Sequence, residues 1–144
     1  MITVKDILQV KGKDVLSITP DVTVYDALKI MADKNVGALV VLDGESVAGI
    51  MSERDYARKV ILHGKSSREM LAGEIMTSKV YYVSPEQNLQ ECMALMTDKH
   101  VRHLPVLSGE QLVGIISIGD VVKAIIADQE DTIKLLENYI TGGT

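Results

Sequence analysis

Apolar positions along this chain follow the spacing of an amphipathic helix in two places. The first set is spaced i, i+3, i+4, i+7 and consists of Val24, Ala27, Leu28 and Met31. The second set has the same spacing and consists of Leu89, Cys92, Met93 and Met96. Thr23 and Asn88 each stand three residues before an acid, which is typical of a capping box at a helix N-terminus. The pattern predicts two helices, each with one buried face, and Cys92 as a packed hydrophobic side chain.

A different pattern follows each predicted helix. The runs "GALVVLDGESVAGIM" (37–51) and "RHLPVLSGEQLVGII" (102–116) are rich in β-branched residues and turn at Asp43-Gly44 and Ser108-Gly109, which predicts two β-hairpins. Pro105 favours a strand at a sheet edge. Short strands at 15–18 and 80–83 precede the helices, and further helices at 53–62 and 118–128 follow the hairpins. Each half of the chain therefore reads β-α-β-β-α.

The two halves are copies of each other. When residues 20–55 are placed over 85–120 without a gap, 14 of the 36 columns are identical. Matching at random gives about one identity in fifteen to twenty columns at ordinary compositions. We therefore expect a tandem duplication of α+β class forming one module over 1–144, with copy one at about 14–62, a connector at about 63–75 and copy two at about 76–128.

Three segments have no gapless counterpart in this alignment. Residues 3–12 predict a short helix, and the polar connector carries a capping-box pattern at Ser66 and Glu69. Residues 129–141 predict a C-terminal amphipathic helix with Ile133, Leu136 and Ile140 on one face.

Composition narrows the classes of partner. The chain has 144 residues, 47% of them hydrophobic, with 15 basic and 20 acidic side chains and a net charge of −5. A nucleic-acid polymer is disfavoured, because such binding depends on clustered Lys and Arg, and the absence of Trp and Phe disfavours base stacking. No apolar run is long enough for a membrane span, and the first ten residues do not resemble a signal peptide. With a single cysteine, we expect a soluble cytoplasmic protein.

The stretches "GIMSERD" (49–55) and "GIISIGD" (114–120) place a Ser-x-x-Asp motif at each strand-to-helix junction. One interpretation is structural, because Ser-x-x-Asp is itself a capping box. The other is a ligand site, because a helix N-terminus attracts anions and a carboxylate one turn later accepts hydrogen bonds from a ribose diol. The motif alone leaves both interpretations open.

The paired copies, "TPDVTVYDALKIMADKNVGALVVLDGESVAGIMSERD" and "SPEQNLQECMALMTDKHVRHLPVLSGEQLVGIISIGD", closely resemble a tandem pair of CBS domains, the Bateman module. The resemblance covers about residues 1–130. It implies two copies packed about a pseudo-twofold axis, two clefts for adenosine-containing ligands, and pairing of modules into a homodimer. The implied ligands are AMP, ADP, ATP, NAD(H) or S-adenosylmethionine.

The resemblance also assigns residues to these ligands. Asp120 and Asp55 correspond to the ribose contacts. The phosphate contacts correspond to Ser117, Ser52, Gly119, Arg102, His103 and Arg54. The adenine contacts correspond to Leu16, Ile18, Thr19, Val36, Gly37, Ala38, Val80, Tyr81 and Val101.

Several of these residues have structural alternatives. Arg102 and His103 face phosphates in one interpretation; in the other, Arg102 is a surface residue and His103 packs on a neighbouring strand. Arg54 either neutralises a phosphate or pairs with Glu53 or Asp55. Gly119 lets a backbone N–H approach an anion closely, whereas Glu53 repels one, so we expect Asp120 to mark the better phosphate site.

The sequence-based hypothesis is a non-catalytic regulatory module that senses adenine nucleotides and acts on a protein partner in trans. No nucleophile–base pair or metal cluster is evident, and Lys59 reads as part of an ordinary charged helix face. The alternative is a structural dimerisation module with vestigial clefts. Apolar residues on the helices after each motif form either the dimer surface or core: Val60, Ile61, Val121, Val122 and Ile125.

Overall fold

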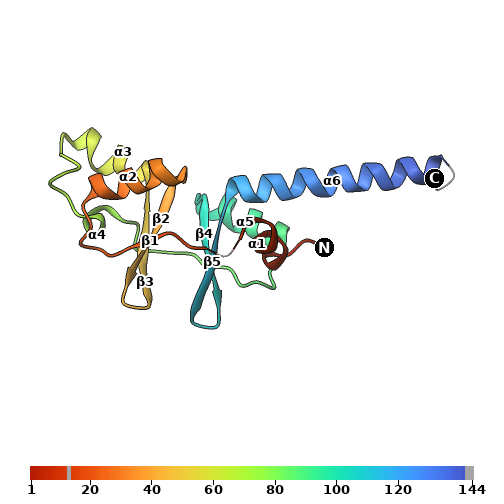
Figure 1. Ribbon diagram of the computed structural model, residues 1–144, viewed down its shortest axis with the longest axis horizontal. Coiled ribbons are helices and arrows are strands. Elements are labelled where there is room, and N and C mark those ends of the chain that lie inside the picture. Colours follow the sequence, from red (N-terminus) through yellow and green to blue (C-terminus); the bar gives the residue numbers. More distant parts are fainter. Residues whose placement is uncertain (13, 142–144) are drawn as a thin grey trace. The chain divides into compact units, whose positions relative to one another are not determined.

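The computed structural model describes residues 1–12 and 14–141, which divide into two compact units (Figure 1). Unit 2 is the continuous segment Asp14–Tyr81. Unit 1 combines the N-terminal segment Met1–Lys13 with Tyr82–Thr144. Both units contain helices and a small sheet, which confirms the α+β class.

Unit 2 is built on a three-stranded sheet. The short strand β1 (Ser17–Ile18) runs parallel to β2 (Ala38–Asp43), which forms an antiparallel hairpin with β3 (Ser46–Ser52). The hairpin turns at Gly44, whose φ of 64° is the left-handed conformation expected of this turn. The helices of the unit are α2 (Val24–Lys34), α3 (Glu53–Lys59), the 3₁₀ helix η1 (Ile61–His63) and α4 (Ala72–Ile75).

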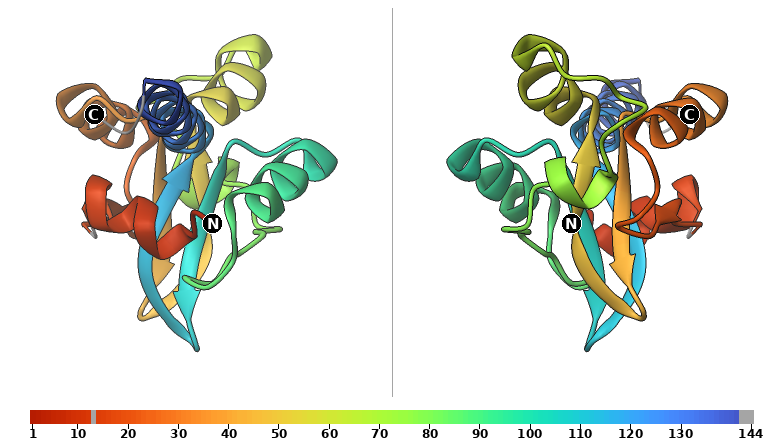
Figure 2. Two further views of the ribbon diagram at one scale, coloured as in Figure 1. Left: turned by 90° about the vertical axis from the view of Figure 1, so that its right-hand side faces the viewer. Right: turned by 90° about the vertical axis from the view of Figure 1, so that its left-hand side faces the viewer.

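Unit 1 repeats this plan with a two-stranded sheet. The antiparallel hairpin of β4 (His103–Ser108) and β5 (Gln111–Ser117) is accompanied by α1 (Val4–Lys11), α5 (Leu89–Lys99) and α6 (Ile118–Ile140), and can be followed in Figure 2. The strand predicted at 80–83 is reduced to one parallel bridge between Val83 and Val106. The predicted strand at 15–18 likewise shortens to the two residues of β1.

The capping box predicted at Asn88 is confirmed, whereas the one predicted at Thr23 forms only its first half. The Thr23 hydroxyl accepts a hydrogen bond from Asp26 N, and the Asn88–Glu91 pair forms a complete capping box. Asn35 and His100 end these helices in the left-handed conformation. The capping box predicted at Ser66 and Glu69 is wrong, because the Ser66 hydroxyl instead accepts from Arg68 N in a local turn.

The C-terminal part of the chain differs from the expected two helices. Residues 118–128 and 129–141 were predicted separately, but α6 runs without interruption from Ile118 to Ile140. No Gly or Pro stands between Asp120 and Ile140 to end a helix there.

Two segments that the alignment left outside the repeat have equivalent positions in the two units. The segment around Thr3 bridges to Asn88, and Val4 N donates to Gln87 O, which fixes α1 at the start of α5. In unit 2, Leu71 bridges to Thr23, and Ala72 N donates to Val22 O, which fixes α4 at the start of α2. The N-terminal segment therefore completes the second copy, and the connector completes the first.

Each unit has its own apolar core. In unit 2 the buried cluster comprises Ile18, Val24, Ala27, Met31, Leu39, Val41, Met51, Val60, Ala72 and Ile75. In unit 1 the buried side chains include Val4, Ile7, Leu8, Leu89, Cys92, Met96, Leu104, Val106, Ile116 and Val121. Burial raises the pKa of the Cys92 thiol to about 11, with a smaller contribution from Glu91, so Cys92 behaves as the predicted packed hydrophobic residue.

The candidate dimer residues divide between core and surface. Val60 and Val121 are buried in their own units, so these two belong to the core. Ile61 and Val122 are 54% and 46% exposed, so these two remain available for contact with another molecule.

Candidate functional site: the two Ser-x-x-Asp junctions

The end of β5 and the start of α6 form the second Ser-x-x-Asp junction. Ser117 N donates to Asp120 Oδ2 (2.8 Å), and Asp120 N donates to Ser117 Oγ (3.2 Å). Ile118 N donates to the carbonyl of Arg102 on β4 (2.9 Å). Among the described residues, Gly119 N is the one donor of this first turn with no acceptor. The sequence predicts several free backbone N–H groups that could bind an anion at this helix start. In the structure one such group, Gly119 N, has no acceptor among the described residues.

The junction between β3 and α3 has the same backbone arrangement. Ser52 N donates to Asp55 Oδ2 (2.9 Å), and Asp55 N donates to Ser52 Oγ (3.1 Å). Glu53 N donates to the carbonyl of Gly37 (3.1 Å). The structural interpretation of Ser-x-x-Asp as a capping box is therefore confirmed at both junctions.

The glycine three residues before each serine allows a second segment to pack closely. A Cβ on Gly49 would lie 2.7 Å from Met76 Sδ and 2.7 Å from the Thr77 carbonyl oxygen. A Cβ on Gly114 would lie 2.7 Å from Leu8 Cδ2. Both glycines are explained by the packing of the segments that contain α4 and α1 against the hairpins.

Asp120 forms an ion pair with a lysine from the far end of the sequence. Lys11 Nζ lies 2.6 Å from Asp120 Oδ2 and also donates to the carbonyl of Ile115 (2.7 Å). Burial by itself raises the pKa of Asp120, but the Lys11 ammonium and the Ser117 N–H outweigh it and hold this pKa below its usual range. The carboxylate is therefore ionised at neutral pH.

The two oxygens of the Asp120 carboxylate differ in their contacts. Lys11 Nζ and Ser117 N both reach Oδ2. No hydrogen bond from the described residues is made to Oδ1, and the Asp120 side chain is 17% exposed. One oxygen of an ionised, oriented carboxylate is thus available as an acceptor.

Asp55 has a fuller set of partners. Its Oδ2 accepts from Ser52 N and Ser52 Oγ, and its Oδ1 accepts from Thr77 Oγ1 (3.0 Å) and pairs with Lys59 Nζ (3.1 Å). Lys59 also donates to the carbonyl of Ile75 (2.8 Å). The interpretation of Lys59 as part of an ordinary charged face is wrong, because it is the counter-ion of Asp55.

Neither counter-ion was identified from the sequence. Lys59 follows Asp55 by four residues, and this helical spacing of opposite charges was the available signal. Lys11 is 109 residues from Asp120, so no local pattern indicates the pair.

The basic candidates beside these junctions have different environments. Arg102 is exposed on its side chain, whereas His103 is partly buried and stands opposite Ser117 in the hairpin register. Burial lowers the pKa of His103, with Lys11 and Arg102 acting in the same direction and Asp120 opposing them. His103 is therefore neutral near pH 7. Arg54 is exposed and makes no ion pair with the described acids around it.

The adenine candidates are distributed over both units. Leu16, Ile18, Thr19, Val36, Gly37, Ala38, Val80 and Tyr81 lie in unit 2, and Val101 lies in unit 1. Within unit 2, Ala38 stands opposite Ser52, and the carbonyl of Leu16 accepts from Val40 N on β2 (3.2 Å). Thr19 is exposed, and its hydroxyl donates to the Asp21 carboxylate. Ile18 is buried in the core of its unit. The assignment of these residues to adenine remains a prediction.

Membrane-spanning and metal-binding features are both absent from residues 1–12 and 14–141. The helices in these ranges are too short or too polar to cross a membrane. No group of three or more His, Cys, Asp and Glu side chains there is arranged to hold a metal ion.

Comparison with known proteins shows which family the chain is similar to. The family model of the CBS domain matches residues 4–62 and 72–127. The chain is 43% identical over 150 residues to the mitochondrial CBS domain-containing protein CBSX3 of Arabidopsis thaliana, covering 98% of this chain and 73% of that protein.

Solved structures are similar over most of their length. A proposed signal-transduction protein with CBS domains from Burkholderia ambifaria superimposes with a TM-score of 0.85 at 55% identity, covering 88% of this chain and 96% of that one. A hexameric CBS-CP12 protein from bloom-forming cyanobacteria superimposes with a TM-score of 0.75 at 30% identity, covering 85% and 70%.

Proposed function

The chain belongs to the CBS domain family, and on that basis we propose that it is a non-catalytic regulatory module that binds adenosine-containing nucleotides at its Ser-x-x-Asp junctions. The proposed ligands are AMP, ADP, ATP or NAD(H). Binding shifts the balance between conformations of the module by as much as the ligand's affinities for those conformations differ, and a protein partner reads the shift. We place the protein in the cytoplasm.

The observation that carries this proposal is the state of Asp120. Its carboxylate is ionised, oriented by the Ser117 N–H and the Lys11 ammonium, and retains Oδ1 as an acceptor. A ribose presents two adjacent hydroxyl donors that a carboxylate accepts well. Gly119, the residue before Asp120, has an N–H with no acceptor among the described residues, and it lies in the first turn of a helix, where an anion is favoured.

The two junctions are proposed to be unequal. Both oxygens of Asp55 already have partners from Ser52, Thr77 and Lys59, so a ribose there must displace one of them. The exposed Glu53 next to Ser52 also repels a phosphate, whereas the corresponding position beside Ser117 is uncharged Ile118. We therefore assign tighter nucleotide binding to the Asp120 junction.

A second candidate function is a dimerisation scaffold whose junctions are structural only. The completed capping boxes and the two lysine counter-ions favour it, because they account for Ser52, Asp55, Ser117 and Asp120 without a ligand. S-adenosylmethionine is the further ligand to distinguish, since it offers the same ribose without phosphates.

Calorimetric titration tests these alternatives. The wild-type protein is titrated with AMP, ADP, ATP, NADH and S-adenosylmethionine, and the titrations are repeated with Asp120→Asn and Asp120→Ala. Because Asp120 also caps α6, Glu91→Ala is the matched control: it removes the equivalent acid from the Asn88–Glu91 capping box of α5 in the same unit.

The nucleotide proposal requires saturable binding by at least one phosphorylated ligand, weakened at least about tenfold, or 1.4 kcal/mol, in both Asp120 variants but unchanged in Glu91→Ala. If Asp55→Ala and Asp120→Ala lose equal nucleotide affinity, the proposal that the two junctions are unequal is contradicted. Binding of S-adenosylmethionine alone would identify that ligand instead. If none of the five ligands produces heat or raises the thermal midpoint, the scaffold function is supported.

A further inference from the structure

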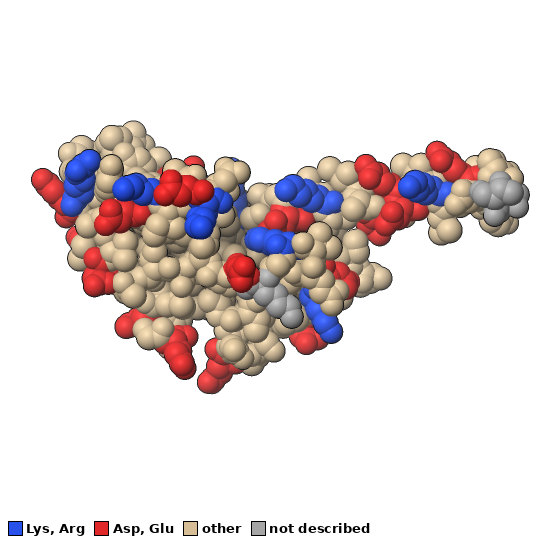
Figure 3. Space-filling view, viewed as in Figure 1, with Lys and Arg blue, Asp and Glu red and all other residues tan. Residues whose placement is uncertain are grey.

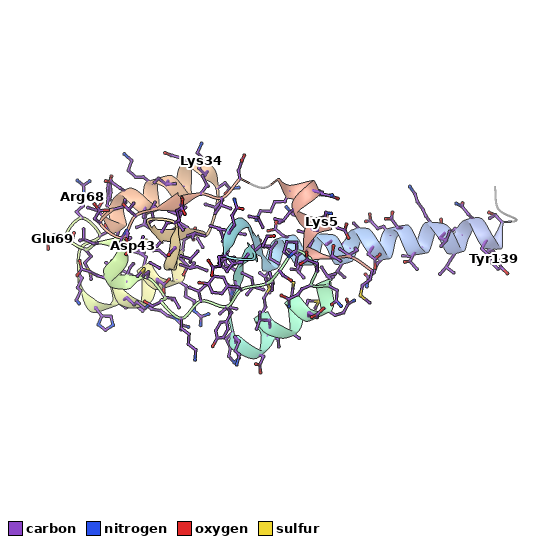
Figure 4. The ribbon with its side chains drawn as sticks, turned by 90° about the horizontal axis from the view of Figure 1, so that it is seen from below. Lys5, Lys34, Asp43, Arg68, Glu69 and Tyr139 are labelled. Atoms are coloured by element: carbon purple, nitrogen blue, oxygen red, sulfur yellow. The ribbon has the colours of Figure 1, made fainter. Side chains whose placement is uncertain are left out.

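The distal part of α6 has no packing partner among the described residues of its own unit. Every residue from Ile126 to Thr141 is exposed, although several are large and apolar. Figure 1 shows α6 continuing past the other elements of its own unit, and Figure 4 shows Tyr139 near the far end with its side chain pointing away from the helix. Such a helix is expected to need a partner, because packing of an apolar face supplies most of the stability of a helix in a protein.

The apolar residues on this segment form a heptad pattern, which we call the α6 seam. The seam comprises Val122, Ile126, Gln129, Ile133, Leu136 and Ile140, with alternating spacings of four and three residues. Ile126, Ile133 and Ile140 take the a positions, and Gln129 and Leu136 take the d positions. From residue 126 to 140, a seam residue therefore recurs on average every 3.5 residues, which is the period of a left-handed coiled coil.

We propose that the α6 seam pairs with the same seam of a second copy of this chain in a parallel two-stranded coiled coil. β-branched residues at a with leucine at d favour two strands over three or four. Gln129 is the one polar seam position, and burying it favours the register in which the glutamines of the two copies meet and hydrogen-bond, at a cost in stability. The proposal is independent of nucleotide binding.

The charges beside the seam favour the parallel orientation. The e positions are Glu130 and Glu137, whereas the g positions are uncharged and comprise Ile125, Thr132 and Tyr139. In an antiparallel pair the e positions face each other, which places glutamates against glutamates. In a parallel pair each e position faces a g position, so Glu137 meets Thr132 of the second copy. Like-charge contacts are therefore avoided only in the parallel arrangement.

The overall charge of the distal part of α6 disfavours a membrane surface as the binding partner of the α6 seam. From Ile126 to Ile140 the helix carries Asp128, Glu130, Asp131 and Glu137 against the single cation Lys134. Figure 3 shows acidic as well as basic side chains along the projecting part of α6. Helices that lie on anionic membranes are instead rich in Lys and Arg on the polar face.

Disulfide trapping tests both the pairing and its orientation in the full chain. Cys92 is replaced by Ala, and a single cysteine is introduced as Leu136→Cys. In a parallel pair this d position meets itself, so oxidation produces a covalent dimer. Leu135→Cys is the matched control, because Leu135 is a neighbouring leucine, 70% exposed, at a c position outside the seam.

We expect Leu136→Cys to form the covalent dimer at micromolar protein and mild oxidation, at least about tenfold faster than Leu135→Cys. Equal rates for the two variants would overturn the proposal. In an antiparallel pair an a position shares its layer with a d position of the other helix. Absence of the Leu136→Cys dimer, with trapping only when Ile126→Cys and Leu136→Cys chains are mixed, would therefore indicate an antiparallel pair and would also overturn the proposal.

Sedimentation equilibrium provides a second measurement that requires no oxidation. Leu136→Glu and Leu135→Glu introduce the same charge one residue apart on an exposed helix, so both variants fold alike. We expect the dimer dissociation constant to rise at least about tenfold in Leu136→Glu alone, since only that leucine is buried on pairing. A wild-type mass that stays at 15.7 kDa at all concentrations, or equal effects of the two variants, would refute the pairing.

Discussion

Replacement of Gly49 by alanine is expected to destabilise unit 2 through a clash that cannot relax easily. The added Cβ would lie 2.7 Å from the Thr77 carbonyl oxygen and 2.7 Å from Met76 Sδ. The Met76 side chain can rotate away, but the carbonyl is fixed by a bridge in which Ile50 N donates to Thr77 O (3.0 Å) and Thr77 N donates to Ile50 O (2.8 Å).

The size of the effect follows from these contacts. Overpacking costs about 1–3 kcal/mol, and each backbone hydrogen bond that is strained or lost costs a further ~0.5–1.5 kcal/mol. We therefore expect the free energy of unfolding to fall by about 2–4 kcal/mol in Gly49→Ala. Gly114→Ala should cost less, about 1–2 kcal/mol, because the three atoms nearest to its Cβ all belong to the flexible side chain of Leu8.

The assay is thermal and urea unfolding followed by circular dichroism. Gly119→Ala is the matched control, since its Cβ would meet only Ser117 Oγ at 3.6 Å and alanine is the better helix former. Adding Leu8→Ala should suppress the effect of Gly114→Ala, whereas adding Met76→Ala should leave most of the Gly49→Ala effect. A Gly49→Ala protein within about 0.5 kcal/mol of wild type would refute this reasoning.

Three other expected outcomes rest on the environments of individual side chains. Lys11→Met removes the counter-ion of Asp120, both partners being partly exposed, so it should cost no more than about 1 kcal/mol at pH 7. Because the folded pKa of Asp120 is lowered, the contribution of the ion pair is complete above the unfolded pKa of about 3.9 and is lost as the pH falls through the folded pKa. The difference in thermal midpoint between wild type and variant should therefore shrink there to the part that comes from the Lys11–Ile115 hydrogen bond, and a difference that stays constant with pH would contradict the ion pair. Thr77→Val removes the hydroxyl donor to Asp55 Oδ1, so calorimetry should detect tighter nucleotide binding at that junction, and unchanged binding would argue against Thr77 as the competitor. Cys92 is buried and the pKa of its thiol is about 11, so mass spectrometry should find no alkylation in the native protein at pH 8 and complete alkylation in urea; native labelling at the denatured rate would place Cys92 outside the core.

The candidate site was only partly predictable from sequence, and the reason differs from residue to residue. The Ser117–Asp120 and Ser52–Asp55 hydrogen bonds span three residues, so the motif alone specifies them once a helix begins there. The ion pair of Lys59 and Asp55 could also have been predicted, because the two residues are four apart on one helix. The charged-face interpretation of Lys59 overlooks this spacing. The ion pair of Lys11 and Asp120 could not be predicted from a local pattern, because only the docking of α1 in unit 1 brings Lys11 close to Asp120.

The fold shows the same division between short-range and long-range information. The hairpins at Gly44 and Gly109 and the N-caps at Thr23 and Asn88 were predicted correctly, because each depends on neighbouring residues. The strand expected at 80–83 was not, because its extent depends on a partner strand, which pairs with it only at Val83. Strand length is decided by pairing as much as by the residues of the strand itself.

By itself, the sequence determined elements whose causes lie within a few residues: the duplicated β-α-β-β-α pattern, the capping boxes at Ser52, Asn88 and Ser117, and the heptad spacing of α6. The tertiary structure decided which segments complete each unit, with α1 joining the second copy and α4 the first. The tertiary structure also decided which lysine forms an ion pair with each aspartate. It left one oxygen of Asp120 without a hydrogen bond from the described residues, whereas both oxygens of Asp55 have partners. These outcomes depend on contacts between residues that are distant in the chain. Forming such contacts costs chain entropy, which is offset only when a whole apolar core is buried, so no local pattern encodes them.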